Sequence, residues 1–391
     1  MFLEKVIKRN PKLIDCAFDL HEKGDILPDT YILDLDAIIE NAKVMKEEAD
    51  RCGIDLYFML KQIGRNPLVA SKLMALGFKG AVAVDFKEAL TMIENGIHIC
   101  NVGHLVQIPK AAMKKILSAK VDYVTVYSKQ IIKEINDCAK KLNIIQKLLI
   151  RISDEDSDLY SGQEGGFASA ELEDLYQYIE SFGNVKLGGF TVFPALLYSE
   201  KEGKIVPTSN IKALNRAIEF ARKKKLDDLN INVPSATCFA SLSLISELNG
   251  TSGEPGHGLT GTTPLHKHGD QPEIPAYVYV SEISHNFQGR AFCYGGGHYR
   301  RSHMENVLVG KNMKEARMLK VLAPSEESID YHYEINEECE VGDCAIMAYR
   351  TQIFTTRSHV AVVSGIQSGK PEVLGLFDAQ GTAIRNGWKD E

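Results

Sequence analysis

The sequence predicts an α/β protein in which a (β/α)8 TIM barrel is followed by a C-terminal, mostly-β domain. Between residues 54 and 254, eight candidate strands, most of them short apolar runs, alternate with amphipathic helical patterns. Strands separated by crossover helices pair in parallel, and eight such units close into a barrel. After about residue 275, strand patterns dominate and helical patterns are few. A chain of 391 residues also exceeds what one hydrophobic core usually supports, which favours two domains.

Along the chain, we expect a helical lead-in over residues 1–29, the barrel domain over residues 30–270 and the β domain over residues 271–391. The run Thr30–Asp36 predicts a strand that ends at Asp36, a suitable N-cap for a helix through about Ala49. The expected barrel strands are Leu56–Leu60, Gly80–Val84, His98–Val102, Val121–Val126, Lys147–Ile152, Leu187–Phe193, Leu229–Pro234 and Thr251–Glu254. Helices expected between them include Phe86–Asn95, Lys129–Leu142, Ala170–Phe182 and Ile211–Lys225. Strands expected in the β domain are Tyr277–Val280, Val307–Val309, Ala345–Tyr349 and His359–Val363.

Composition excludes several classes of partner. The net charge of -7 and the pI near 5.9 give no basic surface of the kind that binds nucleic acid or an anionic membrane. No apolar run has membrane-spanning length and the N-terminus is charged, so we expect a cytoplasmic protein. The eight cysteines form no CxxC pair, and most are expected to be small buried residues. His266 and His268 lack two further matched ligands, so we expect a solvated loop there and no metal.

The barrel is predicted to be organised around Lys61, because this residue directly follows the apolar run Ile54–Leu60 and precedes a turn with Gly64, Asn66 and Pro67. Active sites of this architecture lie at the C-terminal ends of the strands. A partly desolvated lysine there becomes a nucleophile that forms a Schiff base with a carbonyl substrate or with pyridoxal phosphate. The alternative is a lysine that extends from a strand end into water.

Two other strand ends could hold a phosphate. Ser235 and Thr237 follow the seventh strand and precede the helical run Phe239–Leu248, whose free backbone N–H groups and dipole favour an anion. Gly256 and His257 lie in the glycine-rich loop after the eighth strand, and barrels commonly bind phosphate in these two loops. An ordinary Gly/Pro loop has the same composition, so both interpretations stay open at this point.

Glu254 begins the loop after the eighth strand. A carboxylate beside a phosphate site is unfavourable unless it pairs with a cation. A protonated pyridine nitrogen would be such a cation.

Four stretches together resemble the pyridoxal-phosphate enzymes of the alanine racemase-like, fold-type III family. They are Thr30–Ala42, the strand-end lysine of Tyr57–Lys61, the run Val82–Ala89 and the turn Glu254–Gly256. The resemblance covers roughly residues 30–265, and within the family the YhfX-type branch is the most similar. It implies pyridoxal 5'-phosphate as cofactor.

The same resemblance implies roles for single residues. Lys61 would form the Schiff base, and Glu254 would face the pyridine nitrogen. The cofactor's phosphate would be held by Ser235, Thr237, Gly256 and neighbouring N–H groups. The Glu-Pro-Gly turn is closer to the decarboxylases of the family than to alanine racemase. The decarboxylases continue with arginine, whereas this chain has His257, which we also count as a cofactor-binding residue.

The most unusual stretch of the β domain is Phe292–Arg301, with three glycines between Tyr294 and His298. It could be a ligand-facing loop or a plain strand connection, and we favour the former. Its Tyr294 part resembles the turn that carries the catalytic tyrosine of alanine racemase. His298, Tyr299 and Arg300 are the expected substrate contacts, because an arginine suits a carboxylate, although surface arginines are commonly just solvated.

Further resemblances concern assembly and metals. In this family the β domain docks on the barrel mouth of a partner, so a homodimer with shared active sites is expected. The turn Val341–Asp343 resembles one in zinc-dependent D-hydroxyamino-acid lyases. Their His and Cys ligands have no counterpart in Arg350–Phe354, so no zinc is expected there.

Three functional classes remain open on the sequence. The first is a racemase that acts at Cα of a free amino acid with Lys61 and Tyr294 as the two bases. The second is a decarboxylase or lyase with the same cofactor, which Glu254 also supports. The third is a non-catalytic pyridoxal-phosphate carrier, against which the extra β domain counts.

Overall fold

The computed structural model describes residues 2–385, and the chain divides into two compact units. The barrel unit comprises Met45–Met59 and Ala70–Gly256. The sheet unit comprises Met1–Val44, Leu60–Val69 and His257–Glu391.

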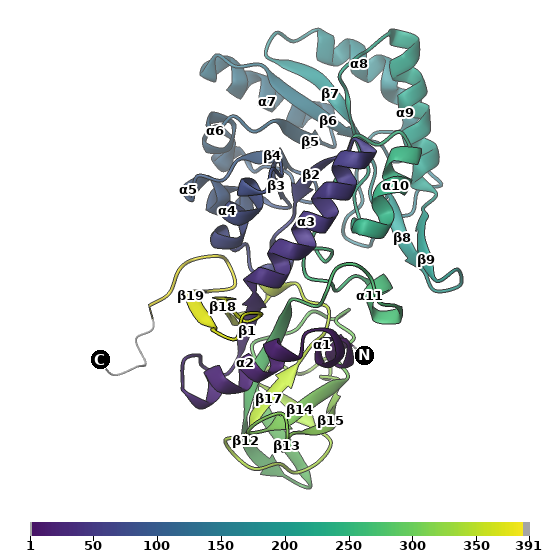
Figure 1. Cartoon of the computed structure of the whole chain (residues 1–391). Coiled ribbons are helices and arrows are strands. Elements are labelled where there is room, and N and C mark those ends of the chain that lie inside the picture. Colours follow the sequence, from purple (N-terminus) through teal and green to yellow (C-terminus); the bar gives the residue numbers. More distant parts are fainter. Residues whose placement is uncertain (1, 386–391) are drawn as a thin grey trace. The chain divides into compact units, whose positions relative to one another are not determined.

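The barrel unit contains a closed barrel of parallel strands in the order β10-β11-β2-β3-β4-β5-β6-β7 (Figure 1). This confirms the predicted (β/α)8 barrel. Its strands are β2 (Asp55–Phe58), β3 (Gly80–Ala83), β4 (Ile99–Val102), β5 (Tyr123–Val126), β6 (Gln146–Arg151), β7 (Val185–Thr191), β10 (Asn230–Asn232) and β11 (Ser252–Gly253). Each of the eight predicted strands overlaps one of these. Buried side chains also link neighbouring strands, as where Thr191 donates a hydrogen bond to Asn232 at 2.7 Å.

Helices surround the barrel strands (Figure 1). Those of the barrel unit are α5 (Phe86–Glu94), α6 (Lys110–Ser118), α7 (Lys129–Leu142), η2 (Ser169–Glu171), α8 (Leu172–Glu180), α9 (Asn210–Lys224) and α10 (Phe239–Glu247), and α4 (Pro67–Ala75) enters it from Ala70. The helix α7 shows why the predicted bounds hold. Ser128 accepts a hydrogen bond from the Ile131 N–H as N-cap, and Asn143 ends the helix in the left-handed conformation.

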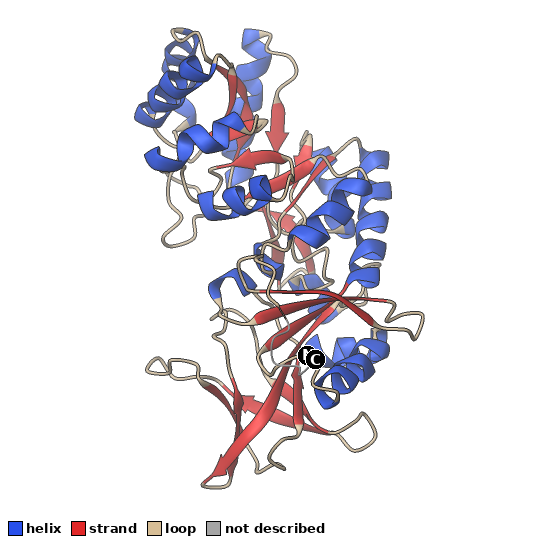
Figure 2. Ribbon diagram, turned by 90° about the vertical axis from the view of Figure 1, so that its left-hand side faces the viewer, coloured by secondary structure: helices blue, strands red, loops and turns tan. Residues whose placement is uncertain are grey.

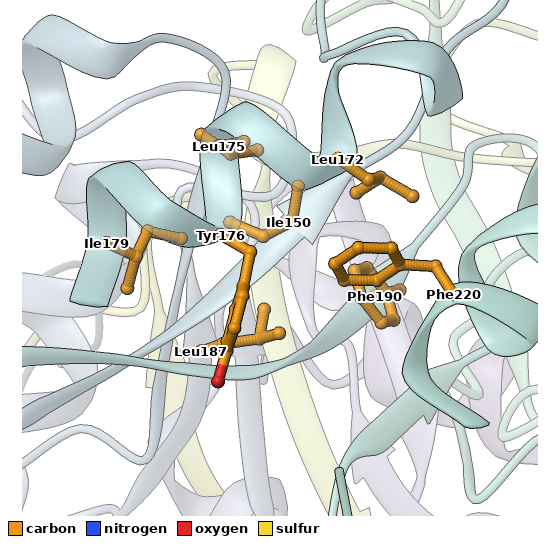
Figure 3. Close-up of a pocket in the computed structure, with 8 residues that line it drawn as sticks. All are labelled: Ile150, Leu172, Leu175, Tyr176, Ile179, Leu187, Phe190 and Phe220. Carbon is orange, nitrogen blue, oxygen red and sulfur yellow. The ribbon is translucent and has the colours of Figure 1, made fainter. Parts of the chain in front are cut away.

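Two features of the barrel unit were not predicted. One is a hairpin of β8 (Leu196–Ser199) and β9 (Lys204–Pro207). The other is a small apolar space between β6, β7, α8 and α9 (Figure 3). The hydroxyl of Tyr176 is the one polar side-chain group among its lining residues, so this space is a packing gap rather than a site for chemistry.

The sheet unit is built on a nine-stranded sheet in the order β13-β16-β15-β14-β17-β12-β1-β18-β19. Figure 2 draws its strands in red. They are β1 (Thr30–Asp34), β12 (Tyr277–Phe287), β13 (Arg290–Tyr294), β14 (Asn306–Gly310), β15 (Arg317–Leu322), β16 (His332–Ile335), β17 (Cys344–Met347), β18 (His359–Ser364) and β19 (Glu372–Phe377). The predicted C-terminal β domain is thereby confirmed as a fold class. β1 lies inside this sheet, antiparallel to β12 and parallel to β18.

Two N-terminal helices pack on this sheet. α1 (Phe2–Arg9) and α2 (Pro11–Glu22) bury an apolar face that includes Leu13 and Phe18 against strand residues such as Val278 and Ile346. The remaining helical segments of the unit are η1 (Lys61–Ile63), α11 (Pro264–His268) and η3 (Ile353–Thr355).

The helix α3 (Leu35–Cys52) begins in the sheet unit and continues into the barrel unit. The prediction of Asp36 as its N-cap is wrong. Asp34 accepts the hydrogen bond from the Ala37 N–H at 3.1 Å, while Asp36 accepts one from the backbone of Gly365. Either aspartate could accept a hydrogen bond as an N-cap. Asp34 is the N-cap because β1 ends at this residue and α3 begins at the next one.

The predicted domain boundaries at residues 29/30 and 270/271 stay predictions, because compactness alone does not show which segments fold independently. None of the helices within residues 2–385 is long and apolar enough to cross a membrane.

Candidate functional site

The barrel unit brings His104 and Glu254 together. Glu254 directly follows β11 and His104 lies two residues beyond β4, so both are at the carboxyl ends of their strands. Nε2 of His104 is 3.7 Å from a carboxylate oxygen of Glu254, and both side chains are fully buried. The ring of Phe193, beyond β7, meets the His104 ring edge-on at 5.1 Å. A buried acid, an imidazole and an aromatic ring therefore lie at the edge where this architecture places its chemistry.

Arg151, the last residue of β6, extends this cluster. Its side chain is fully buried, and its guanidinium carbon lies 5.0 Å from the ring centroid of Tyr127 and 5.9 Å from that of Phe193. It donates hydrogen bonds to the Tyr127 hydroxyl at 2.8 Å and to the Gln163 carbonyl at 2.7 Å. Tyr127 in turn donates to the carbonyl of His104. Burial raises the pKa of Tyr127, and Arg151 acts in the opposite direction.

Arg151 lacks an acidic partner in the described part of the chain, where its Nε also has no hydrogen-bond acceptor. A buried cation without a counter-charge is costly. The position therefore suits a bound anion.

The predicted phosphate-binding residues of the barrel unit lie after β10 and β11. Ser235 has a positive φ of 77° and donates its hydroxyl to the carbonyl of Leu196 at 2.7 Å, so this hydroxyl is engaged within the protein. Thr237 accepts a hydrogen bond from the backbone N–H of Glu254 at 3.0 Å, which ties the two loops together. Gly256 is buried at the end of the unit.

The strands β2 and β11 are neighbours in the barrel, and the Met59 N–H donates to the Pro255 carbonyl at 2.9 Å. From these paired strand ends the chain continues directly to Lys61 and to His257. Both of these residues belong to the sheet unit.

Within the sheet unit, His257 lies in the electrostatic field of Lys61 and Arg350. Burial, and then the charges of Arg350, Lys61 and His266, hold the pKa of His257 well below its usual range. Nδ1 of His257 is 3.2 Å from the Thr262 hydroxyl. Nε2 is buried and has no hydrogen-bond partner within residues 2–385. A neutral imidazole next to cations, with an open nitrogen, is suited to an anionic ligand.

His266 departs from the prediction. Its side chain is buried within α11, with Nε2 at 3.4 Å from a carboxylate oxygen of Glu273 and Nδ1 at 2.6 Å from the Thr263 hydroxyl. The expected solvated loop is therefore wrong for this residue. The polar sequence of residues 266–268 suggested a side chain exposed to solvent. The structure instead places the buried carboxylate of Glu273, 7 positions later, beside His266.

Tyr294 is the last residue of β13 and has an exposed fraction of 39%. The glycine loop that follows packs against the protein's own groups, since a Cβ on Gly296 would lie 2.0 Å from the Asp29 carboxylate. His298 has Nδ1 at 3.4 Å from Asp330. Tyr299 is partly buried, and Arg300 is exposed.

One further cluster contains metal-ligand side chains. His98, Cys100 and Asp122 have ligand atoms within 4.8 Å of one another. Nε2 of His98 already forms a 2.9 Å hydrogen bond with Asp122, and the Cys100 thiol also bonds to this carboxylate. The cluster lies at the amino ends of β4 and β5, and its mutual hydrogen bonds account for it.

Sequence reasoning missed Arg151, Arg350 and the contact between His104 and Glu254. Arg151 did leave a signal, because it is a charged residue at the end of the apolar run Leu148–Ile150. The contact between His104 and Glu254 joins positions 150 residues apart and depends on barrel closure.

Two family models match successive parts of the chain. Residues 33–264 match the model of the alanine racemase N-terminal domain, and residues 278–373 match that of the YhfX-like C-terminal domain. The protein YhfX of Escherichia coli (strain K12) is 41% identical over 388 residues, covering 98% of this chain and 100% of YhfX.

Solved structures show the same fold at low sequence identity. D-threonine aldolase from Filomicrobium marinum superposes with a TM-score of 0.66 at 15% identity, over 91% of this chain and 95% of the aldolase. Alanine racemase from Clostridium difficile 630 superposes with a TM-score of 0.65 at 16% identity, over 90% of this chain and 99% of the racemase. Diaminopimelate decarboxylase from M. jannaschii superposes with a TM-score of 0.65 at 13% identity, over 94% of this chain and 92% of the decarboxylase. By its matched domains and its relative, this chain belongs to the alanine racemase-like family and to its YhfX-type branch.

Proposed function

We propose that the protein is a pyridoxal-phosphate-dependent enzyme that acts at Cα of a free amino acid, as a racemase. The observation that carries this proposal is that Lys61 and His257 follow the hydrogen-bonded ends of the neighbouring strands β2 and β11; burial, and then the charges of Arg350 and Lys61, lower the pKa of His257. The two segments involved leave the barrel from the neighbouring strands β2 and β11.

The residues fit this cofactor. The amine of Lys61, the cationic side chain of Arg350 and the buried, unbonded Nε2 of His257 form a set of groups suited to an aldehyde that carries a phosphate. Lys61 would hold the aldehyde carbon, and Glu254 would hold the pyridine nitrogen. The phosphate would be held by Ser235, Thr237, Gly256 and His257. When bound, the cofactor supplies an electron sink for the negative charge that develops at Cα.

The chain's own groups move the protons. Lys61 removes the α-proton from one face of the substrate, and Tyr294 delivers a proton to the other face. The carboxylate of Glu254 keeps a proton on the ring nitrogen by charge pairing. His298, Tyr299 and Arg300 are proposed to contact the substrate from the loop after Tyr294.

Arg151 is proposed to orient the substrate's carboxylate or an equivalent anionic oxygen. The support is its burial without an acidic partner in the part of the chain that is described. A planar guanidinium binds a carboxylate through two parallel hydrogen bonds, which fixes the substrate's orientation as well as its affinity.

A decarboxylase or lyase is the second candidate, and Glu254 favours it. A carboxylate at the pyridine nitrogen makes a strong electron sink that serves loss of carbon dioxide or side-chain cleavage equally well. A non-catalytic carrier is a weaker candidate, because the barrel alone would serve that role. We also propose a cytoplasmic homodimer in which the loop of Tyr294 completes the active site of the partner subunit.

The holoenzyme, incubated with pools of L- and D-amino acids in deuterium oxide, tests the reaction class. Exchange of the α-proton together with inversion supports the racemase. Release of carbon dioxide supports the decarboxylase, and a new aldehyde or keto acid supports the lyase. No turnover of any amino acid by cofactor-loaded protein would overturn the enzyme proposal and leave the carrier.

A further inference from the structure

Arg65 stands out in the segment that carries Lys61. Its side chain is 2% exposed, and its backbone has a φ of 53°, in the left-handed region. Such a conformation is strained for a non-glycine residue and persists only where surrounding contacts impose it. The position is therefore held by its neighbours and not by its own conformational preference.

The neighbours of Arg65 form a closed ring of contacts. Its guanidinium carbon lies 5.0 Å from the ring centroid of Phe354, and Nη1 donates to the side-chain oxygen of Gln380. Nε2 of Gln380 donates to the Phe354 carbonyl at 2.6 Å. We call Arg65, Phe354 and Gln380 the Arg65 clamp. All three belong to the sheet unit, as Lys61 does.

The turn that contains Lys61 also packs closely against other residues of the sheet unit. Gly64 has a φ of 70°, and a Cβ there would lie 3.1 Å from Cγ2 of Val360 and 3.2 Å from Cγ2 of Ile353. The N–H groups of Ile63 and Arg65 both donate to the Leu60 carbonyl, at 3.0 and 2.9 Å. Lys61 therefore sits inside a short, closed turn whose far end is fixed by the clamp.

We propose that Arg65 is a positioning residue for Lys61, acting through the turn 60–65 and anchored by Phe354 and Gln380. The C-terminal sheet thereby sets where the lysine amine is held, although Lys61 follows a barrel strand in the chain. The inference rests on the proposed function only for the meaning of Lys61 as the cofactor lysine. The positioning itself is a property of the protein without cofactor.

A merely stabilising role of Arg65 makes a different prediction. It would lower the unfolding midpoint while leaving the amine of Lys61 unchanged in protein that is still folded. A positioning role changes the reactivity of this one amine relative to other lysines. The exposed Lys140 on α7 serves as the internal reference.

The test has two readouts on Arg65→Met, Arg65→Lys and Gln380→Ala, with the exposed Arg222→Met on α9 as matched control. Cofactor-free protein is labelled to low extent with formaldehyde and cyanoborohydride, and peptide mass spectrometry gives the Lys61:Lys140 ratio. Separately, pyridoxal phosphate is trapped on Lys61 with borohydride at limiting cofactor.

We expect Arg65→Met to raise the labelling ratio and to slow trapping by at least about fivefold, since a loss of roughly 1 kcal/mol in holding the turn has that effect. Gln380→Ala should act in the same direction, and Arg65→Lys should lie between Arg65→Met and wild type. The double variant of Arg65→Met with Gln380→Ala should be no worse than the stronger single one, because both remove one interaction. Arg222→Met should behave as wild type.

Unchanged labelling and trapping in the folded variants would overturn the positioning role and leave the proposed function standing. Absence of any trapped cofactor on Lys61 in the wild type would overturn the proposed function, while the labelling ratio still decides the positioning role. If Arg65→Met does not fold, the Lys61:Lys140 labelling ratios of Arg65→Lys and Gln380→Ala test the positioning role instead.

Discussion

Nε2 of His104 lies 3.7 Å from the carboxylate of Glu254, and neither side chain is exposed to solvent. Burial strengthens every electrostatic interaction of Glu254, because water no longer screens it. A carboxylate in this environment can hold a proton on a bound pyridine ring. The barrel thus places a buried carboxyl group beside an imidazole at the ends of β4 and β11.

Glu254→Gln should therefore lower turnover by on the order of 10²–10³, the loss seen when one preorganised electrostatic contact is removed. Binding of pyridoxal phosphate to Lys61 should persist, as measured by borohydride trapping. The exposed Glu247→Gln on α10 is the matched control and should keep wild-type turnover. Unchanged turnover in Glu254→Gln would reduce Glu254 to a turn residue.

Arg151→Met should separate stability from function. The substitution removes a buried cation that has no acidic partner, but it also removes the hydrogen bonds to Tyr127 and Gln163, so we expect only a small change in melting temperature. KM for the amino acid should rise between about 10- and 100-fold, because a charge-assisted hydrogen bond is lost. Calorimetry and steady-state kinetics measure the two effects. A large drop in melting temperature with unchanged KM would show that Arg151 is purely structural.

His257 should make the cofactor-free protein less stable in acid. Its folded-state pKa lies well below its usual range, so below about pH 6.5 the unfolded chain binds a proton that the folded protein refuses. The stability contributed by neutral His257 is present above the unfolded pKa and is lost as the pH falls, by at most about 1.4 kcal/mol per pH unit.

Urea unfolding midpoints at pH 7.5 and 5.5 check this prediction. Wild type should lose more stability between these values than His257→Gln. His98 should give stability the opposite pH dependence, because its hydrogen bond to Asp122 raises the pKa of His98. Its contribution is present in acid and is lost as the pH rises, so wild type should exceed His98→Gln more at pH 5.5 than at pH 7.5. Parallel curves for wild type and His257→Gln would show that His257 is not held neutral.

Mixed dimers test whether the active site is shared between subunits. Lys61→Ala and Tyr294→Phe should each be inactive in racemisation, and their random mixture should recover about a quarter of wild-type activity, because one site of each heterodimer has both residues intact. Differential tags measure heterodimer formation. Formation of heterodimers without recovered activity would place Tyr294 in its own subunit or remove it as the second base. His298 and Tyr299 would then be the candidates to test.

The barrel could be predicted because its signals are local. Most of its strands lie in apolar runs, and helices such as α7 have a cap and a periodic buried face, so that the bounds of α7 agree with the prediction. The strands β13, β15, β16 and β19 were missed. β15 shows why, because four of its residues are not buried and it lacks an apolar run.

The parts that could not be predicted depend on contacts between distant segments. Asp34 and Asp36 have the same capping chemistry, and only the pairing of β1 with β12 and β18 decides which one ends the strand. His266 looks exposed in sequence until Glu273 is found beside it. The burial of Arg65 likewise depends on Phe354 and Gln380, roughly 300 residues further along the chain.

The most direct test of the proposal is chemical capture of the cofactor. Protein loaded with pyridoxal phosphate, reduced with borohydride and mapped by mass spectrometry, should carry the cofactor on Lys61. Lys61→Ala should still bind pyridoxal phosphate, but weakly and without a covalent adduct at this position. Finding the adduct on another lysine, or finding none on the wild type, would contradict the account.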